Sequence, residues 1–132
     1  MQLLAPAGSP EAVIAAVQSG ADMIYMGAGL TAPGRNEEPF DAETLIQSIR
    51  YCRIRGCGVA VSVAGLCTDD TLPGMVEQAV KAAQNGADAL VVQDMGLIAV
   101  LRQVLPDIPL WGRDVPRKVC YSFLRPPEAR RR

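Results

Sequence analysis

The sequence contains no histidine, few aromatic residues (5%) and no Cys-x-x-Cys pair. Without histidine, a zinc site of the usual kind is nearly excluded, and so are a serine triad and a histidine-activated cysteine nucleophile. The spacing of the four cysteines does not match that of iron–sulfur ligands, and isolated cysteines are typical of small core side chains. They are Cys52, Cys57, Cys67 and Cys120. We therefore expect no metal site in this chain.

Long apolar runs are also missing, because no stretch approaches the 18 residues that a membrane span needs. The first residues carry no basic lead-in of the kind that begins a secretory signal. The sequence thus predicts no membrane partner and a cytoplasmic location. With 132 residues, of which 49% are hydrophobic, one domain with a sizeable core is expected.

Charge is distributed unevenly, although the net charge is only −1. Residues 1–112 contain 6 basic and 12 acidic side chains, whereas residues 113–132 contain 7 basic and 2 acidic side chains and three of the ten prolines. A basic arm for nucleic acid would account for the second segment. Its lack of any amphipathic period favours a disordered or out-of-family tail, so we place a boundary after residue 112.

A repeated motif indicates the architecture. Gly-Ala-Asp occurs at 20–22 and again at 86–88, each time between a helix-like stretch and a short apolar run. A weaker copy, Arg-Gly-Cys at 55–57, lies between them. Helix–glycine–strand joints about thirty residues apart have the period of βα units.

Apolar runs predict strands over residues 3–5, 23–26, 59–63, 89–92 and 108–111. Helical periodicity lies between these runs. Ser9, Asp41 and Asp94 each precede a helix as capping residues, and one of Asp69 and Asp70 is expected to cap the third helix. Four βα units and a fifth strand follow from this pattern.

Such a chain is half of an eight-fold barrel, and we predict a partial TIM-type (β/α) barrel with a parallel sheet over residues 1–112. The alternative is a small, open, doubly wound sheet. A half barrel would leave its first and last strands unpaired, so self-association through exposed sheet edges is expected.

Functional residues of a barrel lie at the carboxyl ends of the strands. Gln93, Asp94, Asp69 and Asp70 follow predicted strands there, and they are our candidate substrate-binding residues. Helix capping is a competing role for Asp94 and for the Asp69–Asp70 pair. The Gly-Ala-Asp motifs fall at the opposite edge, where a structural role is expected. No catalytic residue is identified.

The ordered motifs resemble those of peptidase family U32, also called the collagenase-like proteases. Leu-Leu-Ala-Pro-Ala-Gly-Ser-Pro-Glu at 3–11 and Gly-Ala-Asp-Met-Ile-Tyr-Met-Gly at 20–27 carry the resemblance. Segments 40–45, 68–70 and 86–96 continue it in order, so it covers roughly residues 2–111. The resemblance implies a TIM-type barrel and either protease activity or hydroxylation of RNA or ubiquinone.

The resemblance also implies partners and cofactors. Peptide or RNA is the substrate expected of full-length relatives, and several of these use a 4Fe–4S cluster. The family's cysteine signature lies downstream of this chain, so no cysteine here inherits it. Two departures from the family pattern are Ala64-Gly65-Leu66 and the segment from Trp111 into the basic tail.

Three hypotheses remain open at this point. The chain is a truncated U32 peptidase-like protein that is inactive alone, or a fragment of an RNA-hydroxylation enzyme whose iron–sulfur half is missing. The third is a small, non-catalytic, open-sheet binding domain.

Overall fold

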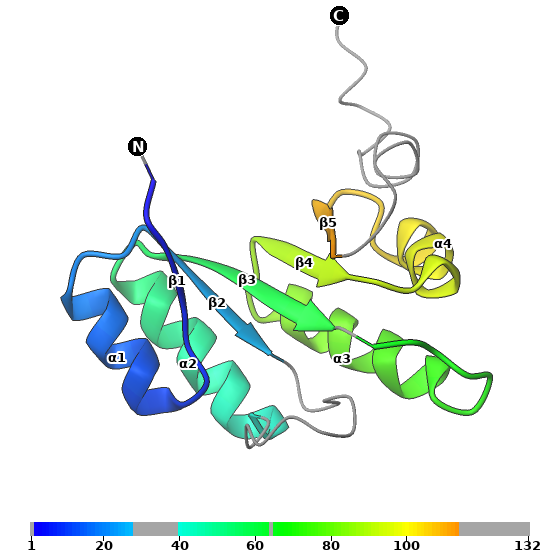
Figure 1. The fold of residues 1–132 in the computed structure, drawn as a ribbon, viewed down its shortest axis with the longest axis horizontal. Helices are drawn as coiled ribbons and strands as arrows, with labels where there is room; N and C mark the ends of the chain where they lie inside the picture. The colour runs from blue at the N-terminus through cyan, green and yellow to red at the C-terminus, as the bar shows by residue number, and fades with distance from the viewer. Residues whose placement is uncertain (1, 28–39, 64, 114–132) are drawn as a thin grey trace, which may run out of the picture.

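The computed structural model describes residues 2–27, 40–63 and 65–113. Strands and helices alternate through these residues (Figure 1). The elements are β1 (Leu4–Pro6), α1 (Pro10–Gln18), β2 (Met23–Gly27), α2 (Ala42–Ile54), β3 (Gly58–Val63), α3 (Leu72–Gln84), β4 (Ala89–Val92), α4 (Met95–Val104) and β5 (Leu110–Gly112). The first and last strands lie one or more residues later than their apolar runs predict. The basic segment after residue 113 and the glycine-rich stretch 28–39 lie outside the described residues.

The five strands form one parallel sheet in the order β1-β2-β3-β4-β5. Each strand pairs with its neighbour in the chain, as it does in a (β/α) barrel. A doubly wound sheet would reverse its strand order about the first strand, and this sheet does not. The predicted α/β fold with a parallel sheet is confirmed, and its strand order agrees with a partial barrel, whereas the doubly wound order of the alternative is wrong.

All four helices cover the same face of the sheet (Figure 1). The main core lies between them and this face, where Val59, Val61 and Val63 of β3 are at most 1% exposed. Alternate residues of a strand point to opposite faces, so Ala60 and Ser62 point to the face that no described helix covers. We call this second face the inner face.

The three helix–glycine–strand joints share one backbone design. Gly20, Gly56 and Gly86 have φ angles of 91°, 70° and 105°, which only glycine adopts easily. In each joint the residue after the glycine donates its amide to a carbonyl five residues earlier, as in the joint where Cys57 N donates to Cys52 O at 2.9 Å. These bonds form a Schellman motif, which ends each helix and directs the chain into the next strand.

Three of the four helices begin with the cap that the sequence predicts. Side chains of Ser9, Asp41 and Asp94 accept hydrogen bonds from the amide three residues later, at 3.2, 2.7 and 3.0 Å. The third helix differs, because its first turn follows Thr71, whose side chain makes no cap bond.

The expectation that Asp69 or Asp70 caps α3 is therefore wrong. Thr68 and Thr71 bond to each other instead: Thr71 Oγ1 accepts the Thr68 amide at 2.9 Å, and Thr68 O accepts the amides of Thr71 and Leu72. This turn places both aspartates before the helix, exposed to solvent.

The inner face carries a small apolar cluster of its own. Ala60, Ala89 and Val91 are its buried members, and Met23 and Tyr25 pack against them. In the described part of the chain, β1 and β5 each have one strand neighbour and so form the two edges of the sheet. Both edges and the inner face are where the rest of a barrel would be placed.

Candidate functional site

The carboxyl ends of β1, β3, β4 and β5 are followed by described residues at one rim of the sheet. We call this the carboxyl rim. It contains Ala7 to Ser9, Gly65 to Asp70, Gln93 with Asp94, and Arg113. The amide of Arg113 donates to Val92 O at 2.8 Å, which holds the end of β5 beside the end of β4.

Asp94 connects two loops of the carboxyl rim. One carboxylate oxygen caps α4 through the Leu97 amide, and the other accepts the amide of Cys67 at 3.2 Å. Burial raises the pKa of Asp94, but hydrogen bonds from the backbone amides outweigh this effect and leave the pKa below its ordinary value. Asp94 is thus a fixed carboxylate that remains ionised at neutral pH.

Cys67 lies beside this carboxylate and in contact with α3. Its Sγ lies 3.2 Å from the sulfur of Met75. Burial raises the pKa of the Cys67 thiol, and the negative charge of Asp94 raises it further. A thiol held in its protonated form is a poor nucleophile, so this site does not activate Cys67.

The remaining candidates lie on either side of this contact. Gln93 is half-buried directly after β4, while Asp69 and Asp70 are exposed in the turn that follows Cys67. The structure brings Asp94 to the loop of Asp69 and Asp70 through the Cys67 amide. Among the described residues, no three histidine, cysteine, aspartate or glutamate side chains gather as a metal ion would require.

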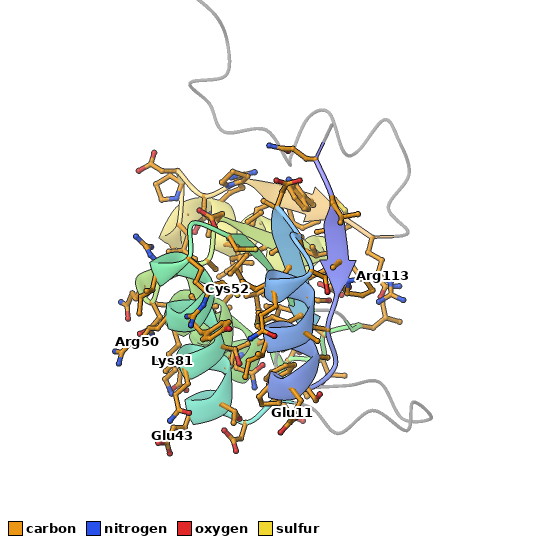
Figure 2. All side chains as sticks on the ribbon, turned by 90° about the vertical axis from the view of Figure 1, so that its left-hand side faces the viewer. Glu11, Glu43, Arg50, Cys52, Lys81 and Arg113 are labelled. Carbon is orange, nitrogen blue, oxygen red and sulfur yellow. The ribbon has the colours of Figure 1, made fainter. Side chains whose placement is uncertain are left out.

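The cysteines do not fit an iron–sulfur cluster. Cys52 and Cys57 lie at the amino edge of the sheet, where Cys57 Sγ donates to Ala21 O at 3.3 Å. Cys67 lies at the opposite rim, and Cys120 is outside the described residues. Because the ligands of a cluster must converge on one point, the three described cysteines, which lie at opposite edges of the sheet, do not form its ligand set. Cys52 is buried in the main core, and Figure 2 shows it well apart from Arg113.

Two inner-face residues near the rim were not identified from the sequence. Tyr25 lies opposite Ala60, and Ser62 lies opposite Gly27 in the parallel register. Ser62 is 5% exposed and is one of two buried polar residues in the described chain. In β3, small residues alternate with valines, and this alternation separates the residues of its two faces. Because the strand is apolar throughout, however, the sequence does not show which of the two groups points to the inner face.

The model of the Peptidase family U32 matches residues 8–112 of this chain. The chain belongs to peptidase family U32. The match begins after β1 and extends through β5, and it includes the candidate residues Asp69, Asp70, Gln93 and Asp94.

Curated relatives of two kinds are similar to this U32 chain. A collagenase of Porphyromonas gingivalis is 26% identical over 111 residues, which are 83% of this chain and 27% of the relative. The tRNA hydroxylation protein P1 of Bacillus subtilis is 23% identical over 107 residues, covering 81% of this chain and 25% of its own length. A Helicobacter pylori tRNA hydroxylation protein P is 27% identical, with 83% and 26% coverage. The chain spans about a quarter of the length of these relatives.

Solved structures support the fold. The U32 peptidase Mk0906 has a TM-score of 0.61 at 18% identity, over 83% of this chain and 47% of that one. A type I 3-dehydroquinate dehydratase from Clostridium difficile has a TM-score of 0.60 at 12% identity, over 85% and 51%. About half of each of these two chains thus superposes on this chain. No helix in the described ranges combines the length and apolarity needed to cross a membrane.

Proposed function

We propose that this chain forms the amino-terminal half of the barrel of a U32 peptidase-like protein and contributes the peptide-binding part of its carboxyl rim. The observation that carries the proposal is Asp94, an ionised carboxylate fixed by two backbone amides at that rim. Asp69 and Asp70 add exposed carboxylates to the loop that Asp94 holds, and Gln93 adds an amide that can pair with a peptide backbone.

Charge favours a peptide over RNA at this rim. Residues 1–112 contain twice as many acidic as basic side chains. Carboxylates attract basic side chains and amide N–H groups, and they repel phosphates.

We assign bond cleavage to parts of the family fold beyond these residues, and we propose that the chain is inactive alone. The Ser9 hydroxyl is engaged as a helix cap. The Cys67 thiol is held protonated beside Asp94. Neither group has the activating base that a nucleophile needs. The cytoplasmic location that the sequence predicts stays a prediction.

A second candidate is RNA binding, with the chain as part of an RNA-hydroxylation enzyme. Two observations favour it: tRNA hydroxylation proteins are among the similar relatives, and residues 113–132 carry a balance of 7 basic to 2 acidic side chains.

Fluorescence anisotropy of the full chain with a labelled collagen-derived peptide and with labelled tRNA distinguishes the two. We expect peptide binding that the triple variant Asp69→Asn, Asp70→Asn, Asp94→Asn weakens at least about 10-fold, as loss of paired charges at an interface does. The control Asp107→Asn removes an exposed carboxylate in the turn before β5, away from the carboxyl rim, and should leave binding unchanged. Binding of tRNA alone, falling steeply with salt, would overturn the peptide proposal and support the second candidate.

A further inference from the structure

Two polar residues continue the inner face at the carboxyl rim. Successive residues of a strand point to opposite faces of the sheet. In β4, Val91 belongs to the inner-face cluster, so Gln93, two residues later, points to the same side. In β5, Leu110 is buried in the main core, so Arg113, three residues later, points to the opposite side. Strand alternation therefore places Gln93 and Arg113 together on the inner face.

The backbone around these two residues supports this placement. The Arg113 amide donates to Val92 O at 2.8 Å, which continues the parallel ladder one step past the end of both strands. The register that pairs Val92 with Gly112 therefore pairs Gln93 with Arg113. Asp94 directs its carboxylate to the first turn of α4, on the helix side of the sheet, so the residue before it points to the inner face.

Gln93 and Arg113 are thus neighbours on adjacent strands. Strands lie about 4.8 Å apart in a sheet, so an amide and a guanidinium group from these two positions can contact one small ligand group together. Both residues are half-buried. Figure 2 shows Arg113 well apart from Arg50 of α2. Among the described segments of the carboxyl rim, Arg113 is the one basic residue.

A guanidinium beside a carboxamide suits the last residue of a peptide. The planar group of arginine has five N–H donors and pairs with a carboxylate through two parallel hydrogen bonds. The side-chain oxygen of glutamine accepts an N–H. In the last residue of a peptide, the backbone nitrogen and the carboxylate are attached to the same Cα, so two side chains on adjacent strands can reach both groups.

The inner face beside this pair is apolar. Val91 and Trp111 are the preceding inner-face residues of the same two strands, and the register pairs them with each other. Val91 is 7% exposed and Trp111 is 39% exposed, so the indole has surface available to a ligand. An apolar side chain of a bound peptide can pack against this surface.

We propose that Gln93 and Arg113 bind the C-terminal residue of a peptide. Arg113 pairs with the terminal carboxylate, the Gln93 oxygen accepts the terminal N–H, and Trp111 contacts the last side chain. This inference rests on the proposed peptide-binding function and gives the bound peptide a direction, with its end beside β5. The match of the family model ends at residue 112, so family membership does not itself assign a role to Arg113.

The aspartates of the rim favour a peptide over RNA as the ligand of Arg113. A peptide brings one carboxylate to one arginine, whereas RNA brings a phosphate with every nucleotide. The further phosphates would meet the carboxylates of Asp94, Asp69 and Asp70 in the neighbouring loops, and like charges repel.

The first test compares two peptides on the unaltered full chain. The same collagen-derived peptide is labelled at its amino end and has either a free C-terminal carboxylate or a C-terminal amide. Fluorescence anisotropy should show at least about 10-fold weaker binding of the amide, because amidation removes the charge that Arg113 pairs with. Only the ligand changes in this comparison, so a folding defect cannot produce the difference.

Variants of the two residues should produce different patterns. Arg113→Gln should weaken binding of the free acid about 10-fold, to the level of the amide, and should weaken binding of the amide no further. Gln93→Leu should weaken binding of both peptides, because both keep the terminal N–H. The matched control Arg50→Gln removes an exposed arginine of α2 and should leave binding of both peptides unchanged.

The outcomes separate this inference from the proposed function. Equal binding of the two peptides to the wild type would overturn the inference and leave peptide binding itself intact. Failure of both peptides to bind would overturn the proposed function, and this inference with it. Loss of tRNA binding in Arg113→Gln, with no difference between the two peptides, would overturn the carboxylate and assign Arg113 to a phosphate.

Discussion

The carboxylate of Asp88 accepts a hydrogen bond from the backbone amide of Val59 at 2.8 Å, and so ties the start of β4 to the start of β3. Asp22 makes the equivalent bond with the amide of Leu3 at 2.7 Å, where β2 meets β1. The aspartate of each Gly-Ala-Asp motif thus secures the preceding strand. This finding confirms the structural role that the repeat predicts and removes both residues from the functional site.

Replacing the two aspartates should have unequal effects. Val59 is fully buried in a central strand, so Asp88→Ala leaves its amide without a partner and should lower the free energy of unfolding by about 1–3 kcal/mol. Leu3 is 55% exposed at the edge, where water replaces the lost bond, and Asp22→Ala should have less than about 1 kcal/mol of effect. Urea denaturation of both variants measures the difference, and equal losses would contradict it.

Asp94 should stabilise the fold in a pH-dependent manner. Asp94→Ala removes the α4 cap and should lower the free energy of unfolding by about 1–2 kcal/mol at neutral pH, whereas Asp70→Ala, in an exposed turn, should change it by less than about 0.5 kcal/mol. The pKa of Asp94 is lower in the folded chain than the value of about 3.9 in the unfolded chain, so its ionised form stabilises the fold at pH values above the unfolded value. This stabilisation is lost as the pH falls through the folded-state pKa.

The corresponding measurement is the difference in unfolding free energy between the wild type and Asp94→Asn from pH 7 down to pH 2. The difference should shrink below about pH 4. A difference that stays constant over this range would show that the charge of Asp94 has no part in stability.

Gly20 and Gly86 should respond alike to alanine. Both have positive φ, so each substitution should cost about 1–2 kcal/mol through backbone strain. A Cβ at Gly86 would meet only the far end of the exposed Arg53 side chain of α2, which can move aside, whereas the space at Gly20 is open. Thermal denaturation of both variants checks this, and a clearly larger loss for Gly86→Ala that Arg53→Ala relieves would contradict it.

Cys52 and Cys57 occupy the contact pair of the second Schellman joint, which is alanine with alanine in the other two joints (Ala16 with Ala21, Ala82 with Ala87). The double variant Cys52→Ala, Cys57→Ala should therefore fold, with a loss of about 1 kcal/mol for the removed sulfur contacts. Failure to fold would show that the thiols do more than pack.

The same thiols predict an effect at high pH. Burial is the main cause that raises the pKa of Cys52 to about 11, and the pKa of Cys57 is also raised. The stabilisation that these two protonated thiols provide is fully present below the thiol pKa of the unfolded chain. It falls as the pH rises from about 9 to 11, because the thiols ionise first in the unfolded chain. The wild type should lose stability over this range, and the double alanine variant should lose less.

Much of the fold could be predicted because each βα unit carries local signals. Ser9, Asp41 and Asp94 cap helices through bonds three residues away, and glycine at Gly20 and Gly86 supplies a backbone angle that few residues tolerate. Interactions between residues so close in the chain can be predicted from the sequence. The start of α3 could not be predicted in this way, because Thr68 and Thr71 are as suitable for hydrogen bonding in this turn as the aspartates between them.

The candidate site was less predictable, since its decisive contact is long-range. Asp94 and Cys67 are 27 residues apart and meet only because β3 and β4 end side by side. The pattern gave Asp94 two competing roles, capping and substrate binding. The structure confirms the first, while the roles of Gln93, Asp69 and Asp70 stay predictions.

The neighbour-to-neighbour order of the strands has a consequence for synthesis. Each new βα unit meets a partner that left the ribosome before it, so no strand must wait for a later segment to find its place. Growth from β1 onward can keep pace with translation. The growing sheet would then expose only one newly formed edge, that of the strand added last, which limits aggregation before release.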